Sequence, residues 1–461
     1  MLKSSIFVTV LSILASVVSF FNQTLIARYF GAGTLMDAYL TISSVPLLIA
    51  SLITSGLSYY LTPYIVKEKL ENPQGYKHFT GSLFTIIIGF STVLSLLVAV
   101  VFNWKMQYIY PNLAKVDHNI LLNICVLTWL NAVINIGMGF YNCLLNANKQ
   151  FLLPVIISFF PYVSVIICCL FFSASLSIVA ISLGLFAGSL MGLMIGMVMA
   201  RKQTIINFSF NNWHKFKIIF KYLPLVMLAM LSFGVYQSID SFWAPRLGHS
   251  NLSYLGYCQR ILVALGVLVI TGPSTVLVPH LTEALIQKRD DDFYKTVVSV
   301  IKIVISLAAF IATVSSVLAF PIIQIMFQRG KFTLSDTTNI SNLLPYMLIG
   351  MVFMLCVVLL FRVLFIKEKI FTVSGIGIAC ALLYFIFSGF AVIFIQKVWG
   401  IGLAYIFTWA IILLIALKAI FTKNEKYFFN KNTFLYFIKL AVNLSVLYIV
   451  TKAFFVFFKS T

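Results

Sequence analysis

The chain has 461 residues, of which 61% are hydrophobic and only 10% are charged, and its formal net charge is +20. Apolar stretches of about 20 residues, the length a helix needs to cross a bilayer, recur from one end to the other. This composition excludes a soluble globular protein and predicts an all-α polytopic membrane protein. The positive charge needs no nucleic-acid partner, because membrane topology and contact with anionic membrane lipids account for it.

In chain order, the apolar stretches predict thirteen membrane spans. We place them at roughly 5–27, 34–65, 79–102, 119–146, 151–173, 176–199, 219–245, 252–286, 296–326, 338–364, 371–395, 399–421 and 433–456. With the N-terminus in the cytoplasm, about 20 of the 32 Lys and Arg fall on the inner side and about 9 on the outer side. The positive-inside rule favours this orientation.

The longest inner connection between spans is basic and polar, and it lies near the middle of the first twelve spans. We interpret residues 201–218 as a cytoplasmic linker between two six-helix halves, 1–200 and 219–422, with an extra C-terminal span in 423–461. No loop exceeds about 20 residues, so the sequence predicts no soluble domain that could hold a separate catalytic site.

A short passage occurs twice in the chain. The two copies are SGLSYYLTPYI, which begins at Ser55, and TGPSTVLVPHL, which begins at Thr271, at an offset of about 216 residues. Upstream of them, Gly31 matches Gly248 at nearly the same offset. In both copies a glycine turn precedes a long apolar helix. A doubled helical unit is typical of a transporter built from two halves with its substrate site between them.

Ionisable groups at membrane depth are costly unless they face a polar cavity or a partner. Arg260, inside the eighth span, is the sharpest case. It is either a cavity-facing cation that binds an anionic group such as a pyrophosphate, or a structural partner of Asp37 or Asp240, or a side chain that extends outward to the interface. The remaining candidate for the substrate path inside a span is Lys302, which we expect near the inner edge.

The residues around the first outer turn form a second group. Arg28 precedes Asp37 by nine residues across this turn, and we expect the two to form a helix-end pair that fixes an outer gate. Gly31 and Gly33 are expected to let the chain turn tightly between the first two spans.

Motifs for covalent chemistry are missing from the sequence. We find no phosphate-binding loop, no metalloprotease motif and no hydrolase nucleophile elbow, and the seven Cys show no metal-ligand spacing. We therefore expect no catalytic residue, no metal and no cofactor, and a protein that is not an enzyme. Transport would be driven by a monovalent cation or proton gradient, the membrane potential or downstream consumption.

Three segments carry a resemblance to a known family. They resemble MurJ (MviN-type) lipid II flippases. The segments are LIARYFGAGTLMDAYLTISSVP, the Tyr257-Cys258-Gln259-Arg260 passage with TVLVPHLTEAL downstream of it, and FQRGKFTLSDT. That family belongs to the wider group of polysaccharide flippases and multidrug antiporters. The resemblance implies two six-helix bundles in a V with an alternating-access cavity, plus one or two C-terminal helices. Arg260 matches the cavity arginine of the family's eighth helix, and Asp37 matches the acid on its second.

The chain departs from the family at several cationic positions. Ser16 and Asn22 stand where the family has arginines on the first helix, Ala50 and Ser51 where it has an arginine pair, and Ser44 where it has a lysine. The resemblance assigns those cations to the lipid pyrophosphate. Their replacement points to a relative that serves another lipid-linked glycan.

These observations predict a monomeric flippase in the bacterial inner membrane. It would move an undecaprenyl-pyrophosphate-linked saccharide, either lipid II or a related surface-polysaccharide unit, from the inner to the outer leaflet. A cation-coupled multidrug antiporter is the first alternative and should have an acid deep in its first or seventh span. A membrane glycan polymerase or ligase is the second, and should have a large outer loop with paired catalytic groups.

Overall fold

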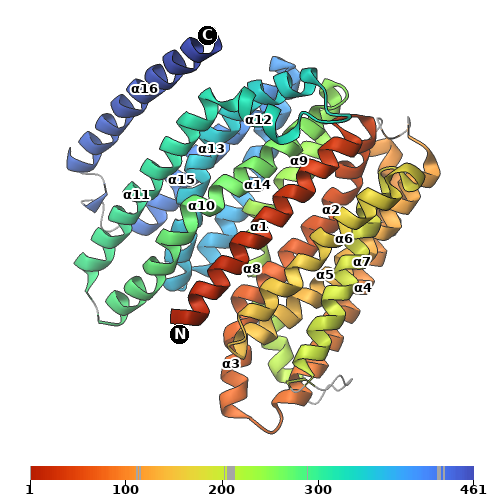
Figure 1. Cartoon of the computed structure of the whole chain (residues 1–461). Helices are drawn as coiled ribbons and strands as arrows, with labels where there is room; N and C mark the ends of the chain where they lie inside the picture. Colours follow the sequence, from red (N-terminus) through yellow and green to blue (C-terminus); the bar gives the residue numbers. More distant parts are fainter. Residues whose placement is uncertain are drawn as a thin grey trace. The chain divides into compact units, whose positions relative to one another are not determined.

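The computed structural model describes the backbone of residues 2–460 except 111–112, 114–115, 202, 205–212, 288, 423–426 and 429–430. Within those residues every regular element is a helix, as the sequence predicts (Figure 1). The elements up to residue 247 are α1 (Leu2–Phe30), α2 (Thr34–Gly56), the π-helical turn η1 (Leu57–Leu61), α3 (Thr62–Glu71), α4 (Tyr76–Ile109), α5 (His118–Ala147), α6 (Leu152–Leu176), α7 (Val179–Ala200), α8 (Trp213–Gly234), α9 (Tyr236–Trp243) and the 3₁₀ turn η3 (Ala244–Leu247). The later elements are α10 (Asn251–Ile286), α11 (Asp290–Val317), α12 (Ala319–Phe327), α13 (Leu334–Ile366), α14 (Ile370–Phe390), the π-helical turn η4 (Ala391–Ile395), α15 (Val398–Phe421) and α16 (Lys431–Ser460).

The helices of the described residues have the length and composition that membrane spans need. Eleven are long and apolar enough to cross a bilayer, and the bent pair α8 and α9 adds a twelfth if it counts as one span. The first expected span, 5–27, lies in α1, and several side chains at its start lie outside the described residues. After α15 the described chain has one long helix, α16, where the sequence predicts the extra C-terminal span.

Two expected spans are broken in the structure. Residues 219–245 do not form one helix, because α8 and α9 meet at a bend of 53°. Residues 296–326 divide into α11 and α12 around Leu318. This second break has a local cause, since Pro321 has no N–H to donate to the carbonyl of Val317, where α11 ends.

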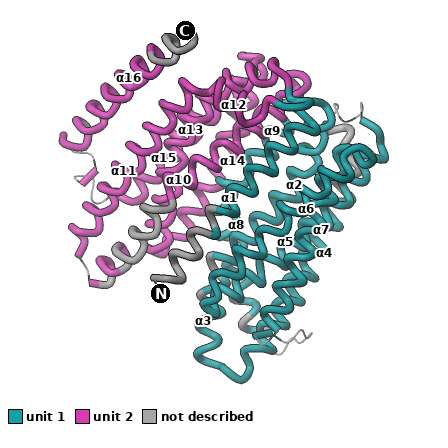
Figure 2. The backbone as a smooth tube through the Cα atoms, in the orientation of Figure 1, with its two compact units in different colours: residues 1–245, 329–332 teal, residues 246–328, 333–461 magenta. Residues whose placement is uncertain are grey.

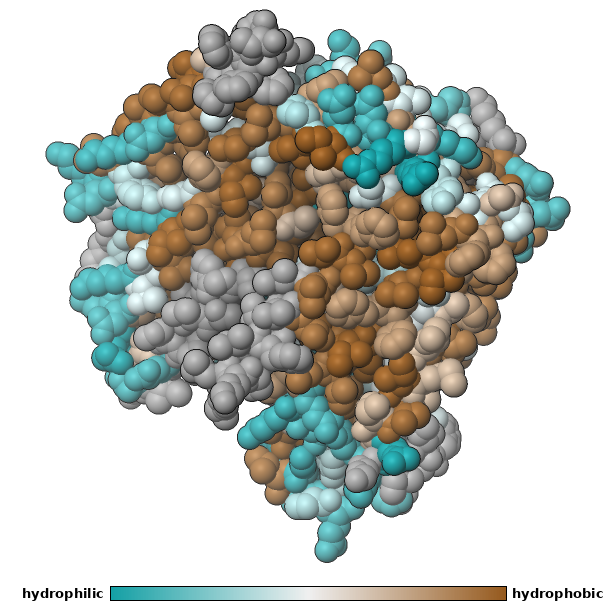
Figure 3. Space-filling model, in the orientation of Figure 1, coloured by the Kyte–Doolittle hydropathy of each residue, from teal (hydrophilic) through white to brown (hydrophobic). Residues whose placement is uncertain are grey.

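The surface of these helices is strongly apolar. Leu97 on α4, Phe171 on α6 and Met194 on α7 are all exposed, at 63%, 74% and 58%. In the first part of the chain apolar residues cover the helices and hydrophilic residues gather around α3 (Figure 3). Large apolar side chains in this number suit contact with lipid tails rather than with water.

The contacts divide the chain into two compact units (Figure 2). Unit 1 holds Met1–Pro245 together with Arg329–Phe332, and unit 2 holds Arg246–Gln328 together with Thr333–Thr461. A four-residue segment between α12 and α13 therefore belongs to unit 1, although the helices on either side of it belong to unit 2. The sequence boundaries at 201–218 and 423–461 stay predictions, and residues 205–212 of the linker lie outside the described chain.

A glycine stripe on α7 allows close helix packing in unit 1. Gly184, Gly188, Gly192 and Gly196 repeat at every fourth position, which places them on one face of the helix. A Cβ on Gly188 would lie 2.5 Å from the carbonyl oxygen of Phe160 on α6. Small residues at this spacing let membrane helices approach backbone to backbone, so α7 packs tightly against α6 and α5.

In unit 2 the long helix α13 is central. It packs against α10, α11, α12, α14 and α15, and its start is held by a capping box between Thr333 and Asp336. Gly350 and Gly402 let α13 and α15 approach closely, since a Cβ on Gly350 would lie 2.3 Å from the Tyr405 ring. α16 packs on α11, and only 6% of its apolar stretch is buried among the described residues.

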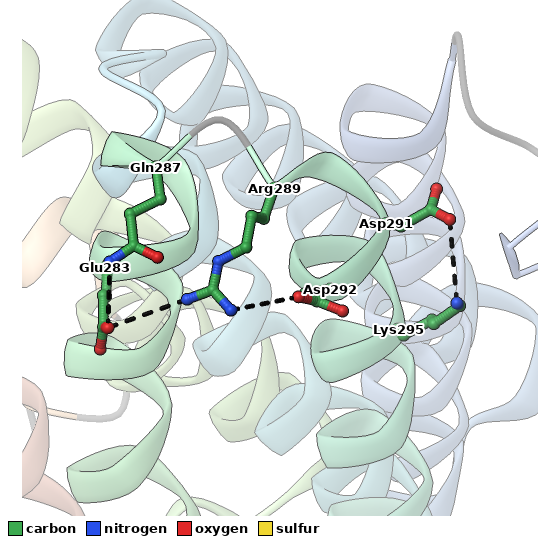
Figure 4. Close-up of polar contacts among 6 residues, drawn as sticks. All are labelled: Glu283, Gln287, Arg289, Asp291, Asp292 and Lys295. Atoms are coloured by element: carbon green, nitrogen blue, oxygen red, sulfur yellow. Dashed lines mark hydrogen bonds and ion pairs between the residues drawn. The ribbon is translucent and has the colours of Figure 1, made fainter.

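The acidic run Asp290, Asp291 and Asp292 forms the first turn of α11. Negative charge at a helix N-terminus is favourable because it complements the helix dipole. Arg289 bridges Asp292 at 3.3 Å and Glu283 at 3.8 Å (Figure 4). These groups are solvent-exposed, so each pair contributes little to stability. The hydroxyl of Tyr427 donates to the Asp291 carboxylate, which raises the pKa of Tyr427 to about 12.

Candidate functional site

The turn between α1 and α2 requires glycine at one of the two expected positions. Gly31 has a φ of +63°, in the left-handed region, so the expected role of Gly31 is confirmed. The expectation for Gly33 is wrong, because its φ of −167° is extended and no atom lies within 4 Å of an added Cβ. Gly248, the repeat partner of Gly31, also has a positive φ, of +117°, just before α10.

The segment Arg329–Phe332 lies against this turn in unit 1. The backbone N–H of Lys331 donates to the carbonyl of Arg28 at 3.0 Å. An added Cβ on Gly31 would lie 2.6 Å from the Lys331 carbonyl oxygen, and one on Gly330 would lie 2.3 Å from the Arg28 carbonyl oxygen. Two glycines therefore let two backbones touch, and they join the first turn of the chain to a loop some 300 residues away.

Arg28 and Asp37 stand on the two sides of this turn. Asp37 is in the first turn of α2 and only 7% exposed, where a carboxylate complements the helix dipole. The side chain of Arg28, in the last turn of α1, is exposed. The ion pair expected between them stays a prediction.

Asp240 lies on α9, beside a polar seam that joins α9 to α2. The Oγ atoms of Ser44 and Ser241 are 3.2 Å apart, and Ser238 donates to the Ser44 carbonyl at 3.2 Å. Asp240 itself is 1% exposed. Asp37 and Asp240 thus lie buried on two helices of unit 1 that hydrogen-bond to each other. A buried acid within the membrane region suits coupling to a cation or a proton.

Arg260 lies on α10, in unit 2, and is half-buried. Its guanidinium carbon is 5.4 Å from the ring centroid of Tyr257, one turn earlier on the same helix. Tyr257 is fixed in turn by Phe327, whose ring centroid is 5.1 Å away. A cation over a buried aromatic ring is held by about 0.5–2 kcal/mol. The ring therefore orients the guanidinium, whose planar N–H groups match the oxygens of an anion such as a phosphate.

Lys302 on α11 contacts an aromatic residue of α16. Its Nζ lies 5.2 Å from the ring centroid of Tyr436 on α16, and the Tyr436 hydroxyl donates to the Lys302 carbonyl at 3.2 Å. Lys302 therefore contributes to the packing of α16 on α11. This contact does not depend on a substrate, and a substrate-binding role for Lys302 remains a prediction.

Several positions that lack the family's cations are buried in unit 1. Asn22, Ser44 and Ala50 are 2%, 2% and 4% exposed, and Ser44 takes part in the α2–α9 seam. A lone cation at such a position would be costly to bury. Ser51 is exposed, and its hydroxyl donates to the Leu48 carbonyl at 2.8 Å.

Sequence reasoning missed a polar pocket between α2 and α5. The pocket measures about 390 Å³, and its polar lining is Thr54, Ser55, Ser58, Asn135 and Asn142. A periodic signal was available, because Thr54 and Ser58 are one helical turn apart and Asn135 and Asn142 are two turns apart on otherwise apolar spans. The pocket was not predicted, because the candidate residues were chosen by charge and every one of these side chains is neutral.

The described residues hold no group of three or more His, Cys, Asp or Glu that could bind a metal ion. All seven Cys are free and buried, as expected of small core residues. The candidate polar groups of unit 1 are therefore two buried acids and a neutral pocket, and that of unit 2 is an arginine oriented by a tyrosine ring.

Comparison with known proteins gives a consistent result. The profile of the family described as "Lipid II flippase MurJ" matches residues 26–461. A probable lipid II flippase MurJ of Buchnera aphidicola subsp. Acyrthosiphon pisum is 24% identical over 433 residues, which cover 91% of this chain and 83% of that protein. A probable lipid II flippase MurJ of Vibrio cholerae is also 24% identical, over 75% of this chain and 69% of its own length.

Solved structures share the fold. A lipid II flippase MurJ in an inward closed conformation superposes with a TM-score of 0.73 at 18% identity, over 98% of both chains. An inward-facing multidrug resistance transporter of the MATE family gives a TM-score of 0.66 at 11% identity, over 89% of this chain and 94% of the other. At these identities the likeness concerns architecture alone.

Proposed function

Because the chain belongs to the lipid II flippase MurJ family, we propose that it moves lipid II, or a closely related undecaprenyl-pyrophosphate-linked saccharide, from the inner to the outer leaflet by alternating access. The observation that carries this proposal is the family match, which runs from the end of α1 to the end of the chain. The family is one of transporters, so the protein is a flippase and not an enzyme. It is a multi-pass protein of the bacterial inner membrane.

The candidate residues have distinct roles in this proposal. Arg260 binds the pyrophosphate, because a guanidinium offers paired donors to phosphate oxygens and Tyr257 holds it in place. Asp37 and Asp240 are the acids available for coupling to a monovalent cation or a proton gradient. The N-terminus is cytoplasmic and the protein acts as a monomer. Each of these assignments is part of the proposal.

A cation-coupled multidrug antiporter shares the architecture and could also use a buried acid such as Asp240. The family match favours the lipid substrate, because it covers all but the first 25 residues. The two functions are separated by the cargo. A flippase accelerates movement of a lipid-linked saccharide between leaflets, whereas an antiporter extrudes drugs against a cation gradient.

The test is transport by purified protein in proteoliposomes, together with rescue of a strain depleted of its own lipid II flippase. We expect accelerated flipping of lipid II and only partial rescue of growth, because Asn22, Ala50 and Ser51 replace cations of the family. Failure to flip any undecaprenyl-pyrophosphate-linked saccharide would refute the function. Full rescue at ordinary expression would show that the missing cations are unnecessary.

A further inference from the structure

The neutral pocket of unit 1 is built from two polar stripes that face each other. On α2 and η1 the stripe contains Thr54, Ser55 and Ser58, and on α5 it contains Asn135 and Asn142. Both helices are otherwise apolar enough to span a membrane. Polar side chains within a span are expensive to keep unless they serve a ligand or a partner.

α5 and α2 approach each other closely at the pocket. An added Cβ on Gly139 would lie 2.6 Å from Cγ2 of Thr54, so glycine alone fits where α5 passes α2. The π-helical turn η1 directly follows α2 and places Ser58 at the pocket. Single π-helical turns inside membrane or soluble helices are frequent at functional sites.

The hydrogen bonds of the lining leave acceptors available to a ligand. The hydroxyl of Thr54 donates to the Ala50 carbonyl at 2.8 Å, and the hydroxyl of Ser58 donates to the Thr54 carbonyl at 2.9 Å. Each of these hydroxyl oxygens can also accept a hydrogen bond, and both residues line the pocket. The Oδ1 atom of Asn142 is buried and accepts no hydrogen bond from the described residues. A buried acceptor without a donor costs free energy that a ligand can recover.

The ligand that fits is neutral and rich in donors. None of the residues that line the pocket is charged, so a pyrophosphate would find no cation there. A volume of about 390 Å³ lies in the range of sites for small organic molecules and exceeds what a directly coordinated ion fills. Sugar hydroxyls and N-acetyl N–H groups supply donors, and Met138 supplies an apolar contact for a sugar ring.

We infer that this pocket is the saccharide subsite of the transporter and binds the sugar headgroup of the lipid-linked substrate. The inference rests on the proposed function and extends it, because it separates recognition of the sugar from recognition of the pyrophosphate. Sugar recognition then depends on α2, η1 and α5 of unit 1.

The experiment compares two lipids that differ only in the sugar. Lipid II and undecaprenyl pyrophosphate share the polyprenyl chain and the pyrophosphate. Their affinities are measured with purified full-length protein, for the wild type and for Asn142→Leu and Thr54→Val. Thr92→Val is the matched control, because Thr92 is half-buried on α4 and its hydroxyl also donates to the carbonyl four residues earlier, at 2.8 Å.

We expect the wild type to prefer lipid II, and each pocket variant to lower that preference about fivefold through loss of one neutral hydrogen bond. Affinity for undecaprenyl pyrophosphate should stay unchanged in both variants, which also shows that they fold. Thr92→Val should behave as the wild type.

Two outcomes with the pocket variants overturn the inference. One is an unchanged preference for lipid II in both pocket variants. The other is a changed Na⁺ dependence of transport with an unchanged preference, which would make the pocket a cation site. A wild type that flips lipid II without preferring it to the sugar-free lipid also overturns the inference but leaves the function intact. A wild type that flips no lipid-linked saccharide refutes the function itself.

Discussion

Substitution of Gly31 by alanine should release the segment Arg329–Phe332 from the α1–α2 turn. Two local costs arise at this position. The φ of +63° is unfavourable for any residue with a Cβ, by about 1–2 kcal/mol. The new Cβ would also lie 2.6 Å from the Lys331 carbonyl oxygen, which is backbone and can move only with the loop.

The magnitude follows from these two effects. Movement of the loop breaks the hydrogen bond from the Lys331 N–H to the Arg28 carbonyl, which contributes about 0.5–1.5 kcal/mol. Together with the backbone strain, Gly31→Ala should favour the released loop by about 1.5–3.5 kcal/mol. The equilibrium between docked and released loop then shifts about 10- to 300-fold.

Hydrogen exchange followed by mass spectrometry measures this equilibrium directly, because the Lys331 amide is the donor of the hydrogen bond to the Arg28 carbonyl. Peptides that cover residues 328–334 should exchange tens of times faster in Gly31→Ala than in the wild type. Gly33→Ala is the matched control, since Gly33 is extended and an added Cβ meets nothing within 4 Å. Gly330→Ala should reproduce the effect from the other side, where its Cβ would lie 2.3 Å from the Arg28 carbonyl oxygen.

Equal exchange in Gly31→Ala and Gly33→Ala would refute the reasoning, because the two variants differ only in backbone conformation and in the contact with the loop. A rise in exchange across the whole protein would refute it in a different way. That result would mean that the turn supports global stability and not the local docking of one loop.

Three further predictions concern the ionisable residues. Arg260→Ala should abolish lipid flipping in proteoliposomes. Arg260→Lys should retain only part of it, because the lysine ammonium is a point charge without the planar, bidentate donors of arginine. Normal transport by the alanine variant would remove this residue from the mechanism. Neutralisation of Arg28 or Asp37 alone should impair transport more than the double change, since one charge is then left without its partner, whereas additive losses would show that the two do not interact. A Cys at Lys331 should react with an impermeant thiol reagent in intact spheroplasts and a Cys at Lys215 should not, and the reverse pattern would overturn the topology.

Local pattern predicted most of the secondary structure. A bilayer requires about 20 consecutive apolar residues, so the spans are visible as composition without knowledge of their neighbours. The end of α11 at Val317 is also a local effect, because Pro321 cannot donate a hydrogen bond to that carbonyl. The left-handed turn at Gly31 was correctly predicted, because few residues other than glycine tolerate that conformation.

The pairing of distant segments was not available from the sequence. Nothing in Arg329–Phe332 indicates that it packs on Arg28 and Gly31, although both segments belong to stretches that resemble the same family. Likewise, Asn142 on α5 and Thr54 on α2 are ordinary polar residues until the fold places them around one pocket. The contact of Lys302 with Tyr436 of α16 likewise appears only in the folded chain.

The sequence by itself determined that this protein is a helical membrane transporter, because apolar length, charge asymmetry and family motifs are properties of short segments. Only the tertiary structure decided which polar side chains meet: the Ser44–Ser241 seam, the contact between Lys331 and Arg28, and the neutral pocket. The physical reason is that helical periodicity fixes which face a residue occupies, whereas the partner of that face depends on packing between helices far apart in the chain.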